Sequence, residues 1–70
     1  MREVEILREP VELFKILKFE GLASSGAEAK AFISAGKVVV NDNVETRKRR
    51  KMLSGDSIVI GEEKIRLVLK

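Results

Sequence analysis

The stretch GLASSGAEAKAFISAGKVVV, residues 21–40, contains the change from helical to β texture on which the fold depends. Ser25 is followed three residues later by Glu28, the capping-box pattern that satisfies free amide groups at the start of a helix. Gly36 suits the end of that helix, because glycine adopts the left-handed conformation common there at little cost. The three valines at 38–40 then favour a strand. The stretch therefore predicts a helix ending at Gly36 and a strand directly after it.

The residues before this stretch predict a strand followed by another helix. Charged and apolar residues alternate from residue 3, which is the period of a half-buried strand over 3–7 with Val4 and Ile6 pointing inward. Pro10 suits the first position of a helix, and the apolar residues from there to Phe19 share one face at helical spacing. We therefore expect two short amphipathic helices that pack together.

The residues after the stretch are rich in β-formers and turns. Asn41 and Asp42 tolerate the positive φ angles of a two-residue turn, so 38–40 should begin a hairpin. Two further strands are predicted at 58–60 and 64–69, joined by a turn at Gly61. The predicted order is strand, helix, helix and four strands.

The first and last strands carry opposite charges on their outer faces. Glu3 and Glu5 lie on one of them, and Lys64 and Arg66 lie on the other. Opposite charges on neighbouring strands are mildly favourable, so we expect the two terminal strands to pair.

Composition excludes several classes of protein. A chain of 70 residues makes one domain, residues 1–70, and without Cys or His it has no disulfide framework and lacks the usual zinc ligands. Nucleophile–base pairs that use Cys or His are equally impossible. We therefore expect no catalytic residues, no cofactor and no metal. No apolar run is long enough to span a bilayer, and the absence of Cys fits a soluble protein of the cytoplasm.

Positive charge is concentrated in one run, RKRRK at residues 47–51, which holds 5 of the 14 Lys and Arg residues. The first half of the chain is slightly acidic, so the surplus behind the net charge of +3 is local. A local surplus attracts phosphates, although such a run can also be no more than a solvated loop. Predicted strands on both sides anchor it, and we expect its five side chains to be exposed.

Only three aromatic residues are present, all Phe. Phe14 and Phe32 lie on apolar helical faces and should be core residues, and Phe19 should pack near Leu22. Three rings are too few for a platform on which successive bases stack. Recognition would therefore depend on phosphates and on shape.

Five segments in this order resemble the RNA-binding domain named after ribosomal protein S-four, in particular its small stand-alone bacterial members. They are LFKILK at 13–18, GLASSGAEAK at 21–30, GKVVVN at 36–41, VETR at 44–47 and LSGD at 53–56. Two positions depart from the family pattern, since Asp42 and Arg49 stand where a glycine is frequent.

The resemblance implies an α+β fold in which two short packed helices, an alpha-L type motif, lie on a small bent, mainly antiparallel sheet of about five strands. It also implies that structured RNA lies along the start of the second helix and the adjoining strand loops. Carried over by position, the RNA-binding residues are Ser24, Ser25, Lys30, Lys37, Asn41, Arg47, Lys48, Arg49, Arg50 and Lys51. Lys15 and Lys18 join them because they lie on the outward arc of the first helix.

The predicted function is that of a monomeric, non-catalytic protein that binds structured RNA, ribosomal RNA or its precursor, through a basic face. Two alternatives stay open. One is a protein-interaction module that docks an acidic partner, which an exposed apolar patch beside the basic run would favour. The other is an accessory domain of a separate RNA-modifying enzyme. The leading prediction requires the cations to converge on one exposed side, not to be matched one for one by carboxylates.

Overall fold

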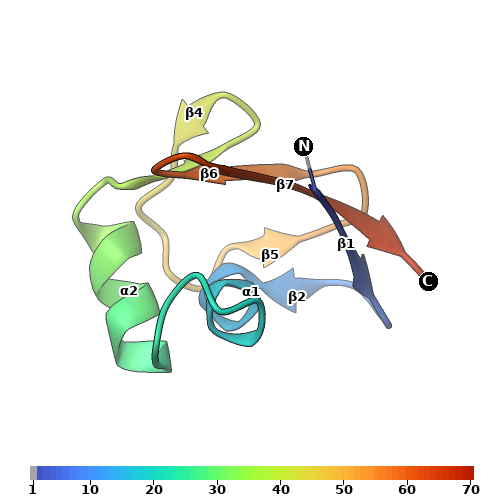
Figure 1. Cartoon of the computed structure of the whole chain (residues 1–70), viewed down its shortest axis with the longest axis horizontal. Helices are drawn as coiled ribbons and strands as arrows, with labels where there is room; N and C mark the ends of the chain where they lie inside the picture. The colour runs from blue at the N-terminus through green and yellow to red at the C-terminus, as the bar shows by residue number, and fades with distance from the viewer. Residues whose placement is uncertain (1) are drawn as a thin grey trace.

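Five strands form one sheet, and both helices lie on one side of it, as the computed structural model of the chain shows (Figure 1). The structure describes residues 2–70. The strand order is β1-β7-β6-β3-β4. The bounds in this sheet are β1 Arg2–Ile6, β3 Val38–Val40, β4 Asn43–Val44, β6 Ser57–Ile60 and β7 Glu63–Leu69. The helices are α1 Leu13–Phe19 and α2 Gly26–Ser34, and a separate two-stranded ribbon joins β2 Val11–Glu12 to β5 Lys51–Met52.

The terminal strands pair, as predicted. β1 runs parallel to β7, whereas the other neighbouring strands of the sheet are antiparallel. Glu3 aligns with Arg66, but Glu5 aligns with Val68 and not with Lys64. The expected charge pairing is therefore only half right, because the register is fixed by the buried side chains of Val4 and Ile6 on the other face.

The predicted start of the first helix at Pro10 is wrong. The chain stays extended through β2, and α1 begins at Leu13. β2 pairs with β5, a partner about forty residues further along the chain that local helical spacing does not reveal. The predicted element order therefore lacks these two short strands.

Local signals placed the second helix and the hairpin correctly. The Ser25 Oγ accepts a hydrogen bond from the Glu28 amide at 3.1 Å, which makes Ser25 the N-cap of α2. Gly36 has a φ of 76°, and the Lys37 amide donates to the Phe32 carbonyl at 3.1 Å, which closes the helix end. The turn after β3 has positive φ angles at both Asn41 and Asp42, so Asp42 is compatible with a tight hairpin.

The core lies between the helices and the sheet. Its fully buried side chains come from α1, α2, β5 and the central strands; the largest are Leu13, Leu17, Ile33, Val38, Val40, Met52, Ile58, Ile65 and Leu67. Phe14 is buried and Phe32 packs against the core, as expected. Phe19 is 69% exposed, so most of its ring lies outside the core. No helix within residues 2–70 is both long enough and apolar enough to cross a bilayer.

Candidate nucleic-acid interface

Three cationic side chains from three different segments surround one aromatic ring. The Lys30 Nζ of α2 lies 4.6 Å from the centroid of the Phe14 ring, the Arg49 Cζ lies 5.2 Å from it, and the Lys15 Nζ of α1 lies 6.0 Å from it. We call Phe14, Lys15, Lys30 and Arg49 the Phe14 cluster. The negative face of an aromatic ring attracts cations, which partly offsets the repulsion between them. The cluster thus gathers positive charge from both helices and the basic run.

The basic run is fastened to the start of α1 through its backbone. The Leu13 amide donates to the Arg50 carbonyl at 2.9 Å, and the Phe14 amide donates to the Lys48 carbonyl at 3.2 Å. The first amides of a helix have no partner within the helix, so these two carbonyls satisfy donors that would otherwise need water or a cap. Pairing of Lys51 with Glu12 in the β2–β5 ribbon adds a further attachment. The run is therefore held in place before any ligand arrives.

Glu45 is a buried carboxylate, 6% exposed, that accepts hydrogen bonds from two arginines. Arg47 donates to it from the backbone amide at 2.9 Å, from Nε at 3.0 Å and from Nη2 at 3.1 Å, and Arg50 donates from Nη1 at 2.8 Å. The Arg47 hydrogen bonds, assisted by Arg50, lower the pKa of Glu45 to about 2. Both guanidinium groups therefore face a carboxylate that stays ionised over the physiological pH range.

Glu12 lies inside the positive region. Its carboxylate is 3.2 Å from the Lys15 Nζ and 3.5 Å from the Arg49 Nη1. The hydrogen bond from Lys15 lowers the pKa of Glu12, and the pairing with Arg49 lowers it further. One carboxylate thus faces two of the three cations of the Phe14 cluster, and the cluster keeps a positive surplus.

The chain matches a known protein family over almost all of its length. A family model described as the S4 domain matches residues 4–68. The chain belongs to the S4 domain family. The Escherichia coli (strain K12) protein YbcJ is 43% identical to this S4 domain over 58 residues, which cover 83% of each chain. The Bacillus subtilis (strain 168) protein named probable ribosome maturation protein RlbA is 37% identical over 57 residues, which cover 81% of this chain and 80% of RlbA.

A solved structure shows the same fold. The solution structure of E. coli YbcJ, described as revealing an alfaL motif involved in RNA binding, superimposes with a TM-score of 0.74 at 39% sequence identity. The match covers 97% of this S4 domain and 87% of YbcJ. The predicted fold class, two helices on a small sheet with paired terminal strands, is thereby confirmed.

Part of the predicted site comes together in this S4 domain. Lys15, Lys30 and Arg49 meet at the Phe14 ring, and Lys18 lies one helical turn beyond Phe14 on α1. Lys48 and Lys51, the latter at the start of β5, are exposed on either side of Arg49 in the basic run, and neither forms an ion pair with any of residues 2–70.

Other predicted residues are engaged elsewhere. The side chains of Arg47 and Arg50 are directed to Glu45, and Arg50 is half-buried, contrary to the expected exposure of the whole run. The Lys37 Nζ lies 6.0 Å from the centroid of the Phe32 ring. Phe32 follows Lys30 by two residues on α2, so the side chains of these two residues point to different sides of the helix. The Phe14 cluster therefore does not include Lys37.

The polar residues of the predicted site have structural partners. Asn41 donates from Nδ2 to the Asp56 Oδ1 at 3.0 Å and accepts from the Ser57 amide at 2.9 Å, so it attaches the hairpin to β6. At the start of α2, the Ser24 amide donates to the Glu28 Oε1 at 2.8 Å, and the Ser25 hydroxyl caps the helix. The helix start expected to accept a phosphate thus already has a carboxylate beside it.

Three residues that organise the site were not predicted as part of it, namely Phe14, Glu12 and Glu45. Phe14 is predicted only as a core residue, because an apolar position at helical spacing gives no sign that cations will gather over its ring. Glu45 stands two residues before Arg47, the one local signal that could have indicated their ion pair. Glu12 contacts Arg49 across 37 positions, and no local pattern predicts such a contact.

Proposed function

We propose that this S4 domain binds structured RNA, ribosomal RNA or its precursor, and that it does so without catalysing a reaction. The observation that carries the proposal is the gathering of Lys15, Lys30 and Arg49 around Phe14. The alfaL motif of YbcJ, described as involved in RNA binding, and the name of RlbA as a probable ribosome maturation protein support it. In this proposal the protein acts as a monomer in the cytoplasm.

Phosphates are the groups that this surface suits. Lysine ammonium groups act as point charges, and the Arg49 guanidinium can donate two parallel hydrogen bonds to phosphate oxygens. We assign direct phosphate contacts to the Phe14 cluster and its exposed neighbours: Lys15, Lys18, Lys30, Lys48, Arg49 and Lys51. Arg47 and Arg50 would contact phosphates only through those guanidinium N–H groups that do not donate to Glu45. The edge of this RNA-binding surface would be formed by Ser24, Ser25, Lys37 and Asn41.

Salt dependence tests the proposal directly. Because Glu12 offsets one charge among the six assigned cations, about five phosphates should be neutralised, and the logarithm of the association constant should fall against the logarithm of salt concentration with a slope of about −3.5 to −4.5. The measurement is fluorescence anisotropy of a labelled, structured ribosomal RNA fragment over a series of salt concentrations. An affinity that does not change with salt would contradict the proposal.

The Glu12→Gln variant should bind RNA about two- to five-fold more tightly than the unaltered protein, because a carboxylate beside the phosphate path repels RNA and occupies Lys15 and Arg49. The matched control is Glu3→Gln, which removes the same charge from the exposed strand β1. Anisotropy titrations of both variants check the prediction. An equal gain in both would mean that only net charge matters.

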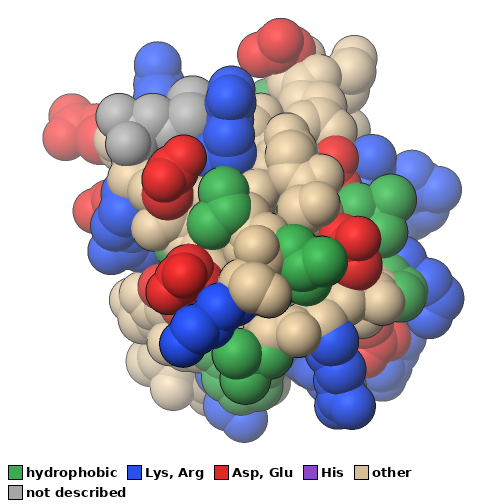
Figure 2. Space-filling model, turned by 90° about the vertical axis from the view of Figure 1, so that its right-hand side faces the viewer, with side chains coloured by type: hydrophobic (Ala, Val, Ile, Leu, Met, Phe, Trp, Pro, Cys, Tyr) green, Lys and Arg blue, Asp and Glu red, His purple; other side chains and the backbone are tan. Residues whose placement is uncertain are grey.

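The alternative function, the docking of a protein, would need the hollow that holds the exposed hydrophobic side chains Leu7 and Phe19. A stable protein interface buries about 800 Å² on each partner. The described residues expose 4444 Å² in total, so such an interface would take about a fifth of this surface. Charged side chains of both signs are interspersed with the hydrophobic ones on the face seen in Figure 2, which is unlike the apolar centre of a protein interface.

A further inference from the structure

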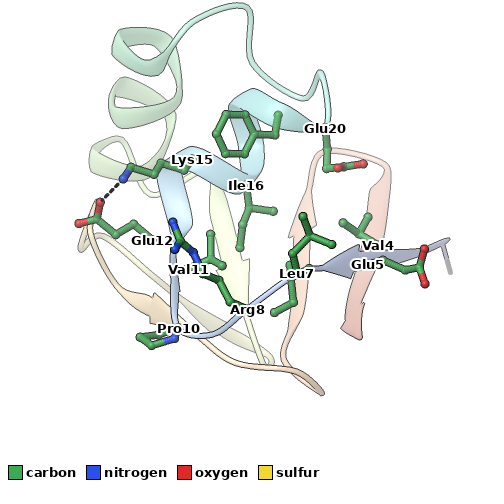
Figure 3. A pocket seen from close by; sticks show the side chains of 12 residues that line it. Val4, Glu5, Leu7, Arg8, Pro10, Val11, Glu12, Lys15, Ile16 and Glu20 are labelled. Atoms are coloured by element: carbon green, nitrogen blue, oxygen red, sulfur yellow. Dashed lines mark ion pairs between the residues drawn. The ribbon is translucent and has the colours of Figure 1, made fainter. Parts of the chain in front are cut away.

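A hollow of about 450 Å³ lies between α1 and the segment that follows β1 (Figure 3). Leu7 is 81% exposed at its edge, Phe19 is 69% exposed, and Val11 and Ile16 contribute further apolar wall. Figure 3 shows Leu7 and Ile16 pointing toward one another across it. Large hydrophobic side chains this exposed beside one hollow are typical of a binding site for a partly apolar group.

The hollow adjoins the Phe14 cluster. Lys15 and Glu12 line the hollow, and their ion pair, drawn as a dashed line in Figure 3, lies at one end of it. Lys15 is also one of the three cations around Phe14. An RNA strand whose phosphates lie on the cluster would therefore carry its next nucleotides past the opening of the hollow.

The walls suit one nucleobase. A base has two apolar faces, which stack on an aromatic ring or an aliphatic side chain, and a polar edge. Phe19 offers the ring and Leu7 the aliphatic group. The carboxylate of Glu20, which lies 3.9 Å from the Arg2 Nη2, also lines the hollow, and its remaining lone pairs can accept hydrogen bonds from the amino groups of guanine, adenine or cytosine. The volume is of the order that a single small ligand occupies.

We propose that this hollow binds one unpaired base of the same RNA whose phosphates contact the Phe14 cluster. The inference rests on the proposed function, because it needs an RNA that the protein already holds. Stacking of one base needs only one aromatic ring, that of Phe19, so the presence of only three Phe residues does not argue against this site. The hollow is lined by Arg8 and Lys15 as well as by carboxylates, so its rim carries both signs of charge, whereas the Phe14 cluster has the positive surplus that suits the RNA backbone.

Two RNA probes separate base binding from phosphate binding. The first is a short blunt-ended RNA duplex, and the second is the same duplex with one bulged guanosine. We expect the protein to bind the bulged duplex about ten-fold more tightly than the blunt duplex. The Phe19→Ala variant should lose this preference while its affinity for the blunt duplex changes less than about two-fold. Leu69→Ala, which truncates an exposed hydrophobic side chain outside the hollow, is the matched control.

A second variant reports on the base itself. The chain contains no Trp or Tyr, so Phe19→Trp introduces a unique indole at an exposed position. Stacking of the bulged base should quench its fluorescence, whereas saturation with the blunt duplex should leave most of the signal. Circular dichroism of each variant confirms that the fold is retained.

The outcomes distinguish this inference from the proposed function. Equal binding of both duplexes by the unaltered protein and by Phe19→Ala, with the salt dependence intact, would overturn the base site and leave RNA binding standing. Failure to bind either duplex, or any structured RNA, would overturn both. Self-association that Phe19→Ala abolishes, measured by sedimentation without RNA, would instead make the hollow a contact between two copies of the chain and would overturn the base site.

Discussion

Replacing Lys30 and Arg49 together by Ala should weaken RNA binding about 10- to 100-fold, because hydrogen bonds to charged groups contribute about 1.5–3 kcal/mol each and the two losses do not add fully. Both side chains lie over the Phe14 ring and neither belongs to the core. The salt slope should become shallower by about 2, one unit for each lost phosphate contact. Anisotropy titration at several salt concentrations measures both quantities.

The matched control is the double variant with Ala at Lys64 and Arg66. It removes the same charge from the exposed positions of β7, whose buried residues Ile65 and Leu67 face the core. We expect its affinity to fall less than about three-fold, since distant surface charges are screened. Comparable losses in the two double variants would show that RNA responds to net charge and not to the Phe14 cluster.

Replacing Glu45 by Ala should lower the free energy of unfolding by about 2–3 kcal/mol, because the buried carboxylate holds Arg47 and Arg50 with four hydrogen bonds. The loss leaves Arg50, which is half-buried, without its carboxylate partner. Urea denaturation followed by circular dichroism measures the change. Glu62→Ala, an exposed position in the turn between β6 and β7, is the control and should change stability by less than about 0.5 kcal/mol.

The same carboxylate predicts an acid response. The pKa of Glu45 is lowered from the ordinary 4.5 to about 2 in the folded protein, so its stabilising effect is complete above pH 4.5. As the pH falls from 4.5 toward 2, the unfolded chain binds the proton first and this stabilisation is lost. Unfolding experiments across that interval should show a steeper loss of stability in the unaltered protein than in Glu45→Ala. Equal slopes would contradict the role given to Glu45.

The parts of the fold that sequence predicts well are those specified by neighbouring residues. The capping pattern of Ser25 and Glu28 and the turn at Asn41 and Asp42 lie within a few positions of one another, and each forms as expected. Pro10 misled the prediction because β2 owes its extended form to β5, a distant segment. Local propensity cannot report such a partner.

The candidate site, like the fold, could be predicted from the sequence only in part. A run of five cations is visible in the sequence, so its attraction for polyanions could be predicted. Which cations are neutralised depends on carboxylates that meet them only in the folded chain: Glu12 reaches Arg49 across the β2–β5 ribbon, and Glu45 is buried beneath Arg47 and Arg50. The centre at Phe14 depends likewise on the packing of α1 against α2, where Gly26 lies close to the ring.

The carbonyls of Lys48 and Arg50, which accept hydrogen bonds from the start of α1, restrict how this protein can adapt to a ligand. The backbone of this loop could follow a phosphate only by uncovering two helix amides, so adjustment is confined to side-chain rotamers. We therefore expect the nucleic acid to do most of the bending when the two meet. A small, stiff template of this kind would select among RNAs by how easily each deforms to match it, even where no base is read.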